Sequence, residues 1–319
     1  MHKARRDRLG TGALMIGIPA SVAALVAAGQ ALASPAPAPP QIHPESGHIA
    51  YGDHVVVRGA APPADAGHTV VLEFASGGAT AWSQLGSTTV GSAGAFRLAA
   101  RLEQSGIVRV VDTSSGSLTA SVTSGTANGT AATTSNPVPV DVAAHVRVPT
   151  RSVDALAGQA IQVRGRLLPG VRRRKVALQG LQSGSWHTLA TARTKSAGRF
   201  LLRYVAGSAG QQLIRVRFAG DRLNGRSTAP AGHMNVFRLA LASWYNDGGH
   251  TACGFHAGDG VANRTLPCGT KVVFRYRGRT VTATVDDRGP YVSGRDWDLN
   301  QNTAAALGFG GVGQLWSSQ

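Results

Sequence analysis

The sequence predicts an all-β protein in which two β-sandwich repeats are followed by a small β-barrel. The 319 residues include 41 Gly and 15 Pro, a composition that favours short strands joined by turns over long helices. A block of short strands occurs twice between residues 45 and 238. Residues 239–319 combine short strands with the two cysteines of the chain, which is typical of a small disulfide-closed barrel. With 43% hydrophobic residues, each part can bury a core.

Residues 1–33 have the pattern of a signal peptide. Basic residues precede an apolar stretch from Leu14 to Val26, and a small-x-small cleavage site ends at Ala33. We expect cleavage there and a secreted, cell-wall product. The alternative is an uncleaved membrane anchor, because the stretch from Leu9 to Leu32 is long enough to span a bilayer. Residues 34–44, rich in Pro and Ala, predict an extended linker.

Residues 45–143 and 144–238 are predicted to be two copies of one unit. The copies share four blocks in the same order, at offsets of 106 or 104 residues. The blocks stand at 55–59, 82–85, 92–98 and 108–110 in the first copy and at 161–165, 186–189, 196–202 and 214–216 in the second. Short strands separated by turns in a unit of this size predict an immunoglobulin-like β-sandwich. We assign Trp82 and Trp186 to the sandwich cores rather than to sugar stacking.

The charge of the chain is strongly positive. The formal value of +16 becomes +13 without residues 1–33, which hold four basic residues and one acidic residue. A basic surface attracts anionic polymers, so anionic wall polymers are expected partners. Scattered basic residues and few stacking aromatics argue against nucleic acid. The run Arg172-Arg173-Arg174-Lys175 is either a docking site for an anionic polymer or a solvated hairpin loop.

The C-terminal part, residues 239–319, centres on a strand that ends in charged residues. Alternation in residues 280–285 buries every second side chain, and Gly289-Pro290 stops the strand. Asp286 and Asp287 follow at the strand end, and adjacent strand residues face opposite ways, so the two carboxylates are not expected to share one site. Further strands are expected at 239–245, 271–276 and 314–317, and a short helix at 302–307.

The two cysteines, Cys253 and Cys268, are expected to form a disulfide, since an exported protein meets oxidising conditions. The competing interpretation is a metal site that adds His250 and His256, but this spacing fits no standard structural site. We therefore predict no metal. A Gly-x-Gly-x-x-Gly match at 308–313 lacks the strand, helix and acid of a dinucleotide site, and no cofactor is predicted.

Five motifs follow one another in the C-terminal part. They are Ala-Ser-Trp-Tyr at 242–245, Thr-Ala-Cys-Gly at 251–254, Arg-Thr-Leu-Pro-Cys-Gly-Thr at 264–270, Asp-Asp-Arg-Gly-Pro-Tyr at 286–291 and Gly-Arg-Asp-Trp-Asp-Leu at 294–299. Together they resemble the rare lipoprotein A (RlpA-like) double-psi β-barrel family, which is related to expansins. The resemblance implies a six-stranded double-psi barrel with a groove for peptidoglycan glycan strands. The best-known members of that family are lytic transglycosylases, which move the muramic 6-hydroxyl onto C1 with one carboxyl group acting first as acid and then as base.

The resemblance also assigns residues. Asp287 corresponds to the catalytic acid/base of the family, and Asp298 corresponds to a carboxylate that lines the groove. The predicted substrate-binding residues are Trp244, Tyr245, Arg288, Tyr291, Asn263 and Asp259. Two positions depart from the family: Phe255 stands where an acidic residue is usual, and Asn263 replaces a histidine. His256 or Asp259 are the candidate substitutes.

The sequence therefore predicts a secreted cell-wall protein that binds and remodels peptidoglycan glycan strands. No nucleic-acid partner and no integral membrane partner is expected. Two alternatives remain open. One is a non-catalytic, expansin-like protein that binds or loosens the wall. The other is a structural or adhesion protein in which the barrel is a stable cap. Because the family's set of assisting residues is incomplete, the sequence leaves catalytic activity undecided.

Overall fold

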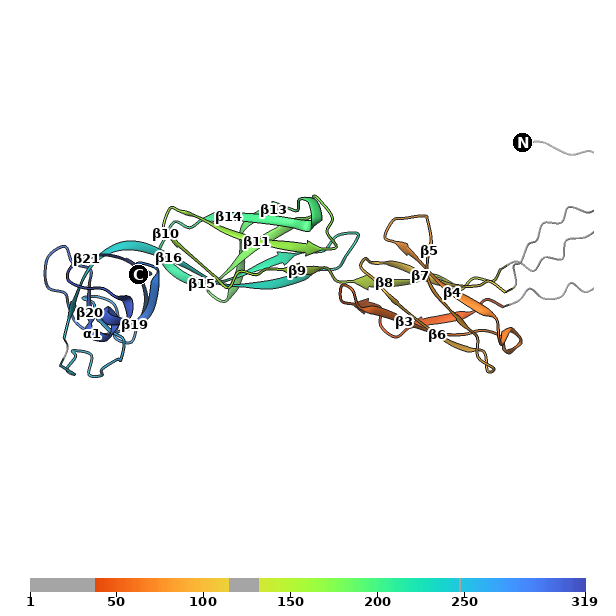
Figure 1. Cartoon of the computed structure of the whole chain (residues 1–319), viewed down its shortest axis with the longest axis horizontal. Coiled ribbons are helices and arrows are strands. Elements are labelled where there is room, and N and C mark those ends of the chain that lie inside the picture. Colours follow the sequence, from red (N-terminus) through yellow and green to blue (C-terminus); the bar gives the residue numbers. More distant parts are fainter. Residues whose placement is uncertain (1–37, 115–131, 247) are drawn as a thin grey trace, which may run out of the picture. The chain divides into compact units, whose positions relative to one another are not determined.

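A computed structural model describes residues 38–114, 132–246 and 248–319 (Figure 1). The predicted signal peptide, 1–33, and residues 34–37 of the predicted linker lie outside the described residues. The linker prediction is wrong for residues 41–44, which form a strand paired with 57–60 and belong to the first repeat. Within the described ranges no helix has the length and apolar character needed to cross a membrane. Apart from one short α-helix and two 3-10 turns, the regular elements of the described chain are all strands, as predicted.

The first repeat is a two-layer β-sandwich. Its three-stranded sheet has the order β1-β3-β6, and its five-stranded sheet has the order β2-β8-β7-β4-β5. The strands are β1 (Gln41–Pro44), β2 (His48–Ile49), β3 (His54–Ala60), β4 (Thr69–Ser76), β5 (Ser83–Thr89), β6 (Ala95–Arg101), β7 (Gly106–Asp112) and β8 (Val138–Val142), with a 3-10 turn η1 (Pro63–Asp65). Buried side chains of both sheets, such as Val57 and Leu98 facing Leu72 and Val110, form one core.

The second repeat has the same construction. One sheet has the order β14-β11-β9, and the other runs β13-β12-β15-β16 with β10 added in parallel to β16. The strands are β9 (His145–Arg147), β10 (Ser152–Leu156), β11 (Ala160–Leu168), β12 (Lys175–Gln182), β13 (Ser185–Arg193), β14 (Arg199–Val205), β15 (Gly210–Phe218) and β16 (Ser227–Tyr245), with η2 (Ser196–Gly198). Its core again takes side chains from both sheets, including Val163, Leu202, Leu178 and Val216.

Strand registers show that the duplication extends to individual residue pairs. In the first repeat Gln41 pairs with Ala60, which pairs with Ala95 on the next strand. In the second repeat Arg147, Arg166 and Arg199 pair in the same way across β9, β11 and β14. The two repeats are therefore equivalent β-sandwiches. Their assignment to the immunoglobulin-like class stays a prediction.

The expectation that Trp82 and Trp186 fill the sandwich cores is wrong. Both indole rings are half-buried and lie outside the buried clusters. The guanidinium carbon of Arg109 lies 4.0 Å from the centroid of the Trp82 ring, and that of Arg215 lies 4.0 Å from the Trp186 ring. Each tryptophan is thus covered by an arginine from a strand two positions away in the same sheet, a cation–π contact that both repeats retain.

The predicted hairpin run 172–175 is not uniformly solvated. Arg174 is only 5% exposed. Its guanidinium donates to Asp221 and to Asn224 at 2.8–3.0 Å. The other three basic residues of the run are exposed. Arg174 is therefore part of the fold of the second repeat, and only its neighbours are free to meet a partner.

The C-terminal part is a six-stranded barrel. Its strands pair in the ring β16-β20-β17-β19-β18-β21, and β21 pairs back onto β16. The new strands are β17 (Gly260–Ala262), β18 (Lys271–Tyr276), β19 (Arg279–Asp287), β20 (Trp297–Asn300) and β21 (Gly313–Ser317). The pairs β16–β20 and β17–β19 are parallel, and the rest are antiparallel. Trp297, Phe274 and Leu315 are among the buried core residues.

The single α-helix of the described chain, α1 (Gln301–Leu307), confirms the helix predicted at 302–307. Asn300 caps its start by accepting a hydrogen bond from the Thr303 amide at 2.9 Å. Gly308 ends it in the left-handed conformation at φ 64°, which glycine adopts without steric cost. Leu307 buries the helix against the barrel core.

Candidate active site

A β-bulge shapes the end of β19. Val285 pairs with Val261 of β17, but the next residue of β17, Ala262, pairs with Asp287. Asp286 is therefore the extra residue of the bulge. A bulge of this kind re-aims side chains and is common beside active sites. Here it gives the two neighbouring carboxylates different surroundings, as predicted, although by a bulge rather than by simple strand alternation.

The bulge places Asp287 in a row that crosses four strands. Asp287 on β19 pairs with Ala262 on β17, Ala262 pairs with Asp298 on β20, and Asp298 pairs with Ser243 on β16. The backbones of the two aspartates are thus two strand spacings apart, about 9–10 Å. The small side chain of Ala262 stands between them. The structure therefore brings Asp287 and Asp298 into one row of paired residues across the barrel wall.

Both carboxylate oxygens of Asp287 are engaged. Oδ1 accepts hydrogen bonds from the backbone amides of Ala252 and Arg288, each at 2.8 Å. Oδ2 accepts one from the Tyr245 hydroxyl at 2.9 Å. The predicted site residues Asp287 and Tyr245 are thus in direct contact, and their geometry is fixed from three directions.

Asp298 is held by residues that the sequence reasoning missed. The Ser243 hydroxyl donates to Asp298 Oδ1 at 2.6 Å, and Arg295 Nη1 donates to the Ser243 oxygen at 2.8 Å. Ser243 lies within the Ala-Ser-Trp-Tyr motif and Arg295 within the Gly-Arg-Asp-Trp-Asp-Leu motif, so the signal was present in the sequence. Their roles became visible only with the parallel pairing of β16 and β20.

Asp286 is fully buried, with 0% of its surface exposed. Its Oδ2 accepts a hydrogen bond from the Ala257 amide at 2.8 Å, while Oδ1 has no partner within the described chain. Burial raises the pKa of this carboxyl above its ordinary value. Gly260 lies against it, and a Cβ atom there would stand 2.3 Å from Asp286 Oδ2. Asp286 therefore anchors the loop that precedes β17.

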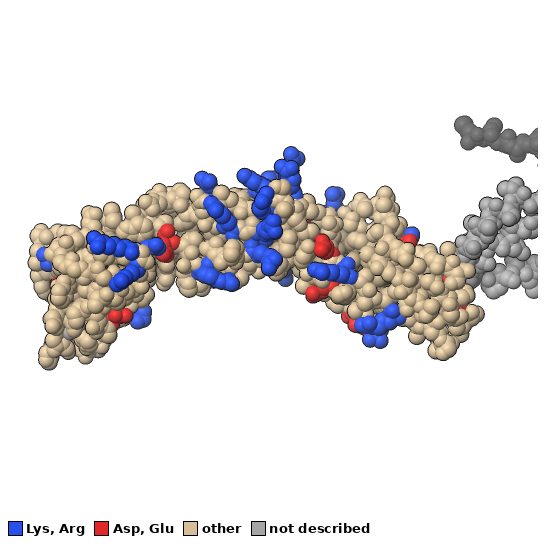
Figure 2. All heavy atoms as spheres, viewed as in Figure 1, with Lys and Arg blue, Asp and Glu red and all other residues tan. Residues whose placement is uncertain are grey.

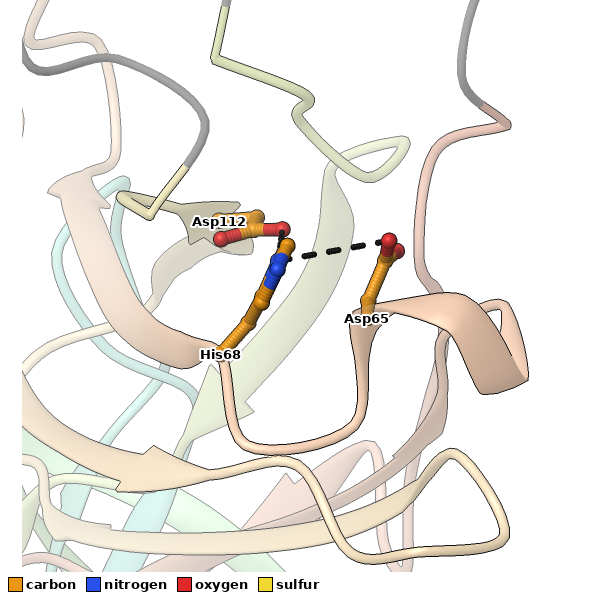
Figure 3. A group of neighbouring side chains, drawn as sticks. All are labelled: Asp65, His68 and Asp112. Atoms are coloured by element: carbon orange, nitrogen blue, oxygen red, sulfur yellow. Dashed lines mark hydrogen bonds and ion pairs between the residues drawn. The ribbon is translucent and has the colours of Figure 1, made fainter.

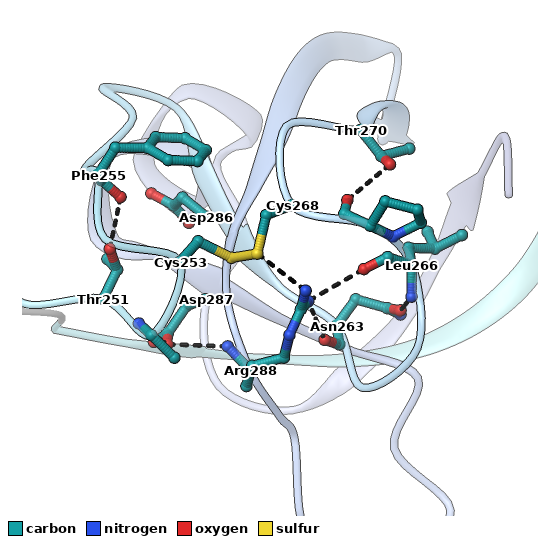
Figure 4. Close-up of a disulfide and its surroundings, with 12 residues drawn as sticks. Thr251, Cys253, Phe255, Asn263, Leu266, Cys268, Thr270, Asp286, Asp287 and Arg288 are labelled. Atoms are coloured by element: carbon teal, nitrogen blue, oxygen red, sulfur yellow. Dashed lines mark hydrogen bonds between the residues drawn. A yellow bond between two sulfur atoms is a disulfide. The ribbon is translucent and has the colours of Figure 1, made fainter.

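Arg288 and Asn263 serve the loop around the disulfide (Figure 4). Arg288 Nη1 donates to the carbonyls of Asn263 and Leu266 at 3.1 and 3.0 Å, and Nη2 lies 2.8 Å from Cys268 Sγ. The Asn263 side chain accepts from the amides of Thr265 and Leu266 at 3.0 and 2.8 Å. Both predicted substrate-binding side chains are thus occupied by the protein itself. Arg288 pairs with no carboxylate among the described residues.

The disulfide between Cys253 and Cys268 is present, with a Cα–Cα distance of 5.8 Å. It joins the loop before β17 to the loop before β18 (Figure 4). The competing metal interpretation needs two free thiolates, and both sulfur atoms are bonded to each other. The bond therefore holds together the two loops that flank Asp287.

Several predicted site residues are exposed rather than drawn into contacts with Asp287. Tyr291 is 82% exposed and Trp244 is 46% exposed. Phe255, at the position where the family has an acid, is 43% exposed. The exposed carboxylate of Asp259 forms no ion pair or hydrogen bond within the described ranges. Exposed aromatic rings of this kind are suited to stacking on sugar rings.

One group of side chains in the first repeat has metal-ligand chemistry (Figure 3). His68 Nδ1 lies 2.9 Å from Asp112 Oδ2 and 3.9 Å from Asp65 Oδ1. The second repeat has Arg174, which is paired with Asp221, at the position equivalent to His68. A cation paired with carboxylate thus occurs at this position in both repeats. We therefore describe the group as an ion pair and assign no metal to it.

Comparison with known proteins matches the barrel. Residues 239–315 match the double-psi β-barrel family model described as "Lytic transglycolase". A curated relative, "Probable endolytic peptidoglycan transglycosylase RlpA" from Synechocystis sp., is 40% identical over 85 residues, which are 24% of this chain and 26% of the relative. This chain thus spans about a quarter of the length of that relative. The C-terminal part is an RlpA-like double-psi β-barrel, as the five motifs indicate.

A solved structure, a chimeric titin Z1Z2-Z1Z2 tandem carrying a fibronectin GRGDS peptide, is also similar to the chain. It shares 15% identity at a TM-score of 0.22 and covers 62% of this chain and 96% of its own. A score this low carries no argument about the repeats.

The contact between Gly260 and Asp286 can be tested by adding one methyl group. We expect Gly260→Ala to destabilise the barrel by about 1–3 kcal/mol, because the new Cβ collides with a buried carboxylate that cannot move freely. Gly258→Ala is the matched control, since a Cβ there meets nothing within 4 Å. Urea denaturation of the full chain, followed by tryptophan fluorescence, measures both variants. Equal midpoints for the two would contradict the proposed packing.

The His68 ion pair predicts a pH dependence of the first repeat. The hydrogen bond to Asp112 raises the pKa of His68 above its ordinary value of 6.5. The stabilisation is therefore complete below pH 6.5 and is lost as the pH rises through the raised pKa. His68→Arg, which copies the second repeat, should abolish this loss because arginine stays charged. Hydrogen-exchange protection factors of β4 and β7 amides, compared between variant and wild type at each pH, measure it. A wild-type protection factor that does not change with pH would refute the assignment.

Proposed function

We propose that the barrel binds peptidoglycan glycan strands and cleaves them as an RlpA-type lytic transglycosylase. The observation that carries this proposal is the row Asp287–Ala262–Asp298, which sets two carboxylates along one barrel edge. The family match of residues 239–315 and the name of the Synechocystis relative support the same substrate class.

The hydrogen bonds of Asp287 leave one position on its carboxyl group open for proton exchange with a substrate. A protonated carboxyl can accept three hydrogen bonds and donate one. Asp287 accepts three from the protein, two on Oδ1 and one on Oδ2. Oδ2 therefore retains room for one proton, and it is the atom that would act on substrate. Tyr245 is the positioning residue for that atom.

The reaction needs no water nucleophile. Asp287 Oδ2 donates its proton to the glycosidic oxygen, the C1–O bond breaks, and positive charge develops at C1. The muramic 6-hydroxyl then attacks C1, and Oδ2 takes up the proton of that hydroxyl. Cleavage gives two fragments: one has a free hydroxyl at its new end, and the other ends in an anhydro-muramic residue. The acid is regenerated. Asp298, held in place by the hydrogen bond from Ser243, would stabilise the charge at C1 or bind a sugar hydroxyl.

A second function, glycan binding without cleavage, has its own support. Phe255 stands where the family has an acid, and the side chain of Asn263 is committed to its own loop. Exposed Trp244 and Tyr291 would still offer stacking surfaces. An expansin-like protein that loosens the wall requires these contacts and no acid. The barrel as a purely structural cap is the third possibility, and it predicts no glycan binding at all.

Export to the cell wall is part of the proposal. The pattern of residues 1–33 supports it, and so does a disulfide, which persists in oxidising compartments. The two sandwich repeats would then act as spacers between the membrane side and the barrel, or as modules that contact the wall.

The decisive experiment incubates residues 34–319 with peptidoglycan stripped of stem peptides and measures anhydro-muramic products by mass spectrometry. We expect product from the wild type and a loss of 10²- to 10⁴-fold in Asp287→Asn, the usual contribution of a general acid/base. Tyr245→Phe should reduce kcat by a smaller factor. Asp53→Asn, an exposed aspartate of the first repeat, is the control and should be as active as wild type.

Binding to insoluble peptidoglycan is measured in parallel. Retained sedimentation without product would contradict the enzyme and support the expansin-like function. Loss of both would leave only the structural role.

A further inference from the structure

The outer face of the sheet β14-β11-β9 carries a row of arginines. Arg199 pairs with Arg166, and Arg166 pairs with Arg147. All three are exposed, whereas Val146 and Phe200, their neighbours in sequence, are buried in the core. Since paired strands lie about 4.8 Å apart, the three positions span about 10 Å in a straight line.

A groove of ≈ 750 Å³ lies over this row. We call it the arginine groove, and its arginines are Arg147, Arg151, Arg164, Arg166 and Arg199. No Asp or Glu lines it, and apolar surface is supplied by residues that include Pro149 and Pro230. Figure 2 shows Lys and Arg side chains gathered over the second repeat, with few acidic groups among them. The groove is therefore a concentrated positive site with an apolar component.

These arginines have no counter-charge among the residues that the structure describes. Within the described ranges none of the five forms an ion pair, and their side chains bond only to neutral groups, as Arg164 does to Gln162 and Arg199 to Ser196. Like charges placed opposite each other on neighbouring strands are destabilising. The strand spacing is shorter than the Debye length of about 8 Å at physiological salt, so solvent ions screen this repulsion only in part.

The first repeat shows that the scaffold does not need this charge. The positions equivalent to Arg147, Arg166 and Arg199 are Gln41, Ala60 and Ala95, in the same registers. Of the exposed arginines on that face, Arg58 and Arg97 share the carboxylate of Glu45 at 2.6 and 3.7 Å, and Arg101 stands at the far end of β6. The first repeat thus pairs two of its three arginines with an acid, whereas the second repeat gathers unpaired arginines into one row.

We propose that the arginine groove binds a linear polyol-phosphate polymer, the phosphodiester type of anionic wall polymer. Guanidinium groups match the two free oxygens of a phosphodiester in a fork geometry. A row of such groups suits successive charges on one extended chain rather than a single small anion. Pro149 and Pro230 offer apolar contact to the polyol carbons. Single-stranded nucleic acid would require several exposed rings for base stacking, whereas the rings that line the groove are one exposed imidazole, His145, and the buried Phe200.

The test titrates residues 34–319 with synthetic poly(glycerol phosphate) of defined length in a calorimeter. The triple variant Arg147→Ala, Arg166→Ala, Arg199→Ala should bind at least tenfold more weakly. The magnitude of the slope of log affinity against log salt concentration should fall by on the order of two. The variant neutralises three fewer phosphates, so fewer counterions leave the flexible polymer on binding. The matched control is Arg172→Ala, Arg173→Ala, Lys175→Ala, which removes the same charge from the exposed hairpin. We expect this control to bind within twofold of wild type.

A stability measurement and one further variant separate binding from folding. Without polymer, the groove triple variant should unfold at the same temperature as wild type or higher, because repulsion has been removed. Conversely, Gln41→Arg, Ala60→Arg and Ala95→Arg together with Glu45→Gln build the same row in the first repeat. That variant should raise the binding stoichiometry from one site to two.

Three results would overturn the proposal. One is an equal loss of polymer affinity in the groove and hairpin variants, which would mean that net charge alone explains binding. Another is unchanged binding in the groove variant. The third is equal or tighter binding of polyglucuronate or oligothymidylate at matched chain charge, which would reject the phosphodiester-polyol assignment. The groove lies outside the barrel, so the glycan-cleavage assay should be unchanged in the groove variant, and the two proposals fail independently.

Discussion

The candidate active site depends on one β-bulge, which gives the adjacent carboxylates of Asp286 and Asp287 different surroundings. At Asp286 the main chain and the side chain both hold the loop before β17, through the amides of Cys253 at 3.1 Å and Ala257 at 2.8 Å. The next residue, Asp287, holds the same loop through the Ala252 amide. Arg288 then fixes the loop on the other side of the disulfide. Three consecutive residues thus organise both loops that border the candidate site, and the disulfide joins the loops to each other.

The sequence was a good guide wherever local pattern decides structure. The alternation before Asp286 predicted β19, the repeated blocks predicted two equivalent sandwiches, and the five motifs predicted the barrel. It failed where partners come from distant strands. Strand β20 is only four residues long and has no alternation signal of its own, and the bulge depends on pairing with β17. Trp82 was misplaced because its covering arginine belongs to another strand.

The two sandwich repeats show what a duplicated scaffold leaves free to change. Core positions and registers are retained, since a shift by one residue would turn every buried side chain outward. Charged positions have diverged instead. The position of the titratable His68 in the first repeat is taken by the permanently charged Arg174 in the second. Likewise, the neutral row of the first repeat corresponds to the arginine row of the second. These charge differences lie on the outer face and at the strand ends, where they alter charge without disturbing the cores.

The same separation of roles by environment explains the Asp286-Asp287 pair. A buried acid is costly, and burial raises the pKa of Asp286, so its neutral form suits the closed space under Gly260. Asp287, one residue later, is partly exposed, accepts three hydrogen bonds and belongs to the same row as Asp298. Asp286 therefore holds the structure together, and its neighbour Asp287 is left for the candidate chemistry. Exchanging their surroundings would require removing the bulge, which would turn Asp287 away from Ala262 and separate it from Asp298. The register of β17 against β19 is thus the constraint on which both the loop and the candidate site rest.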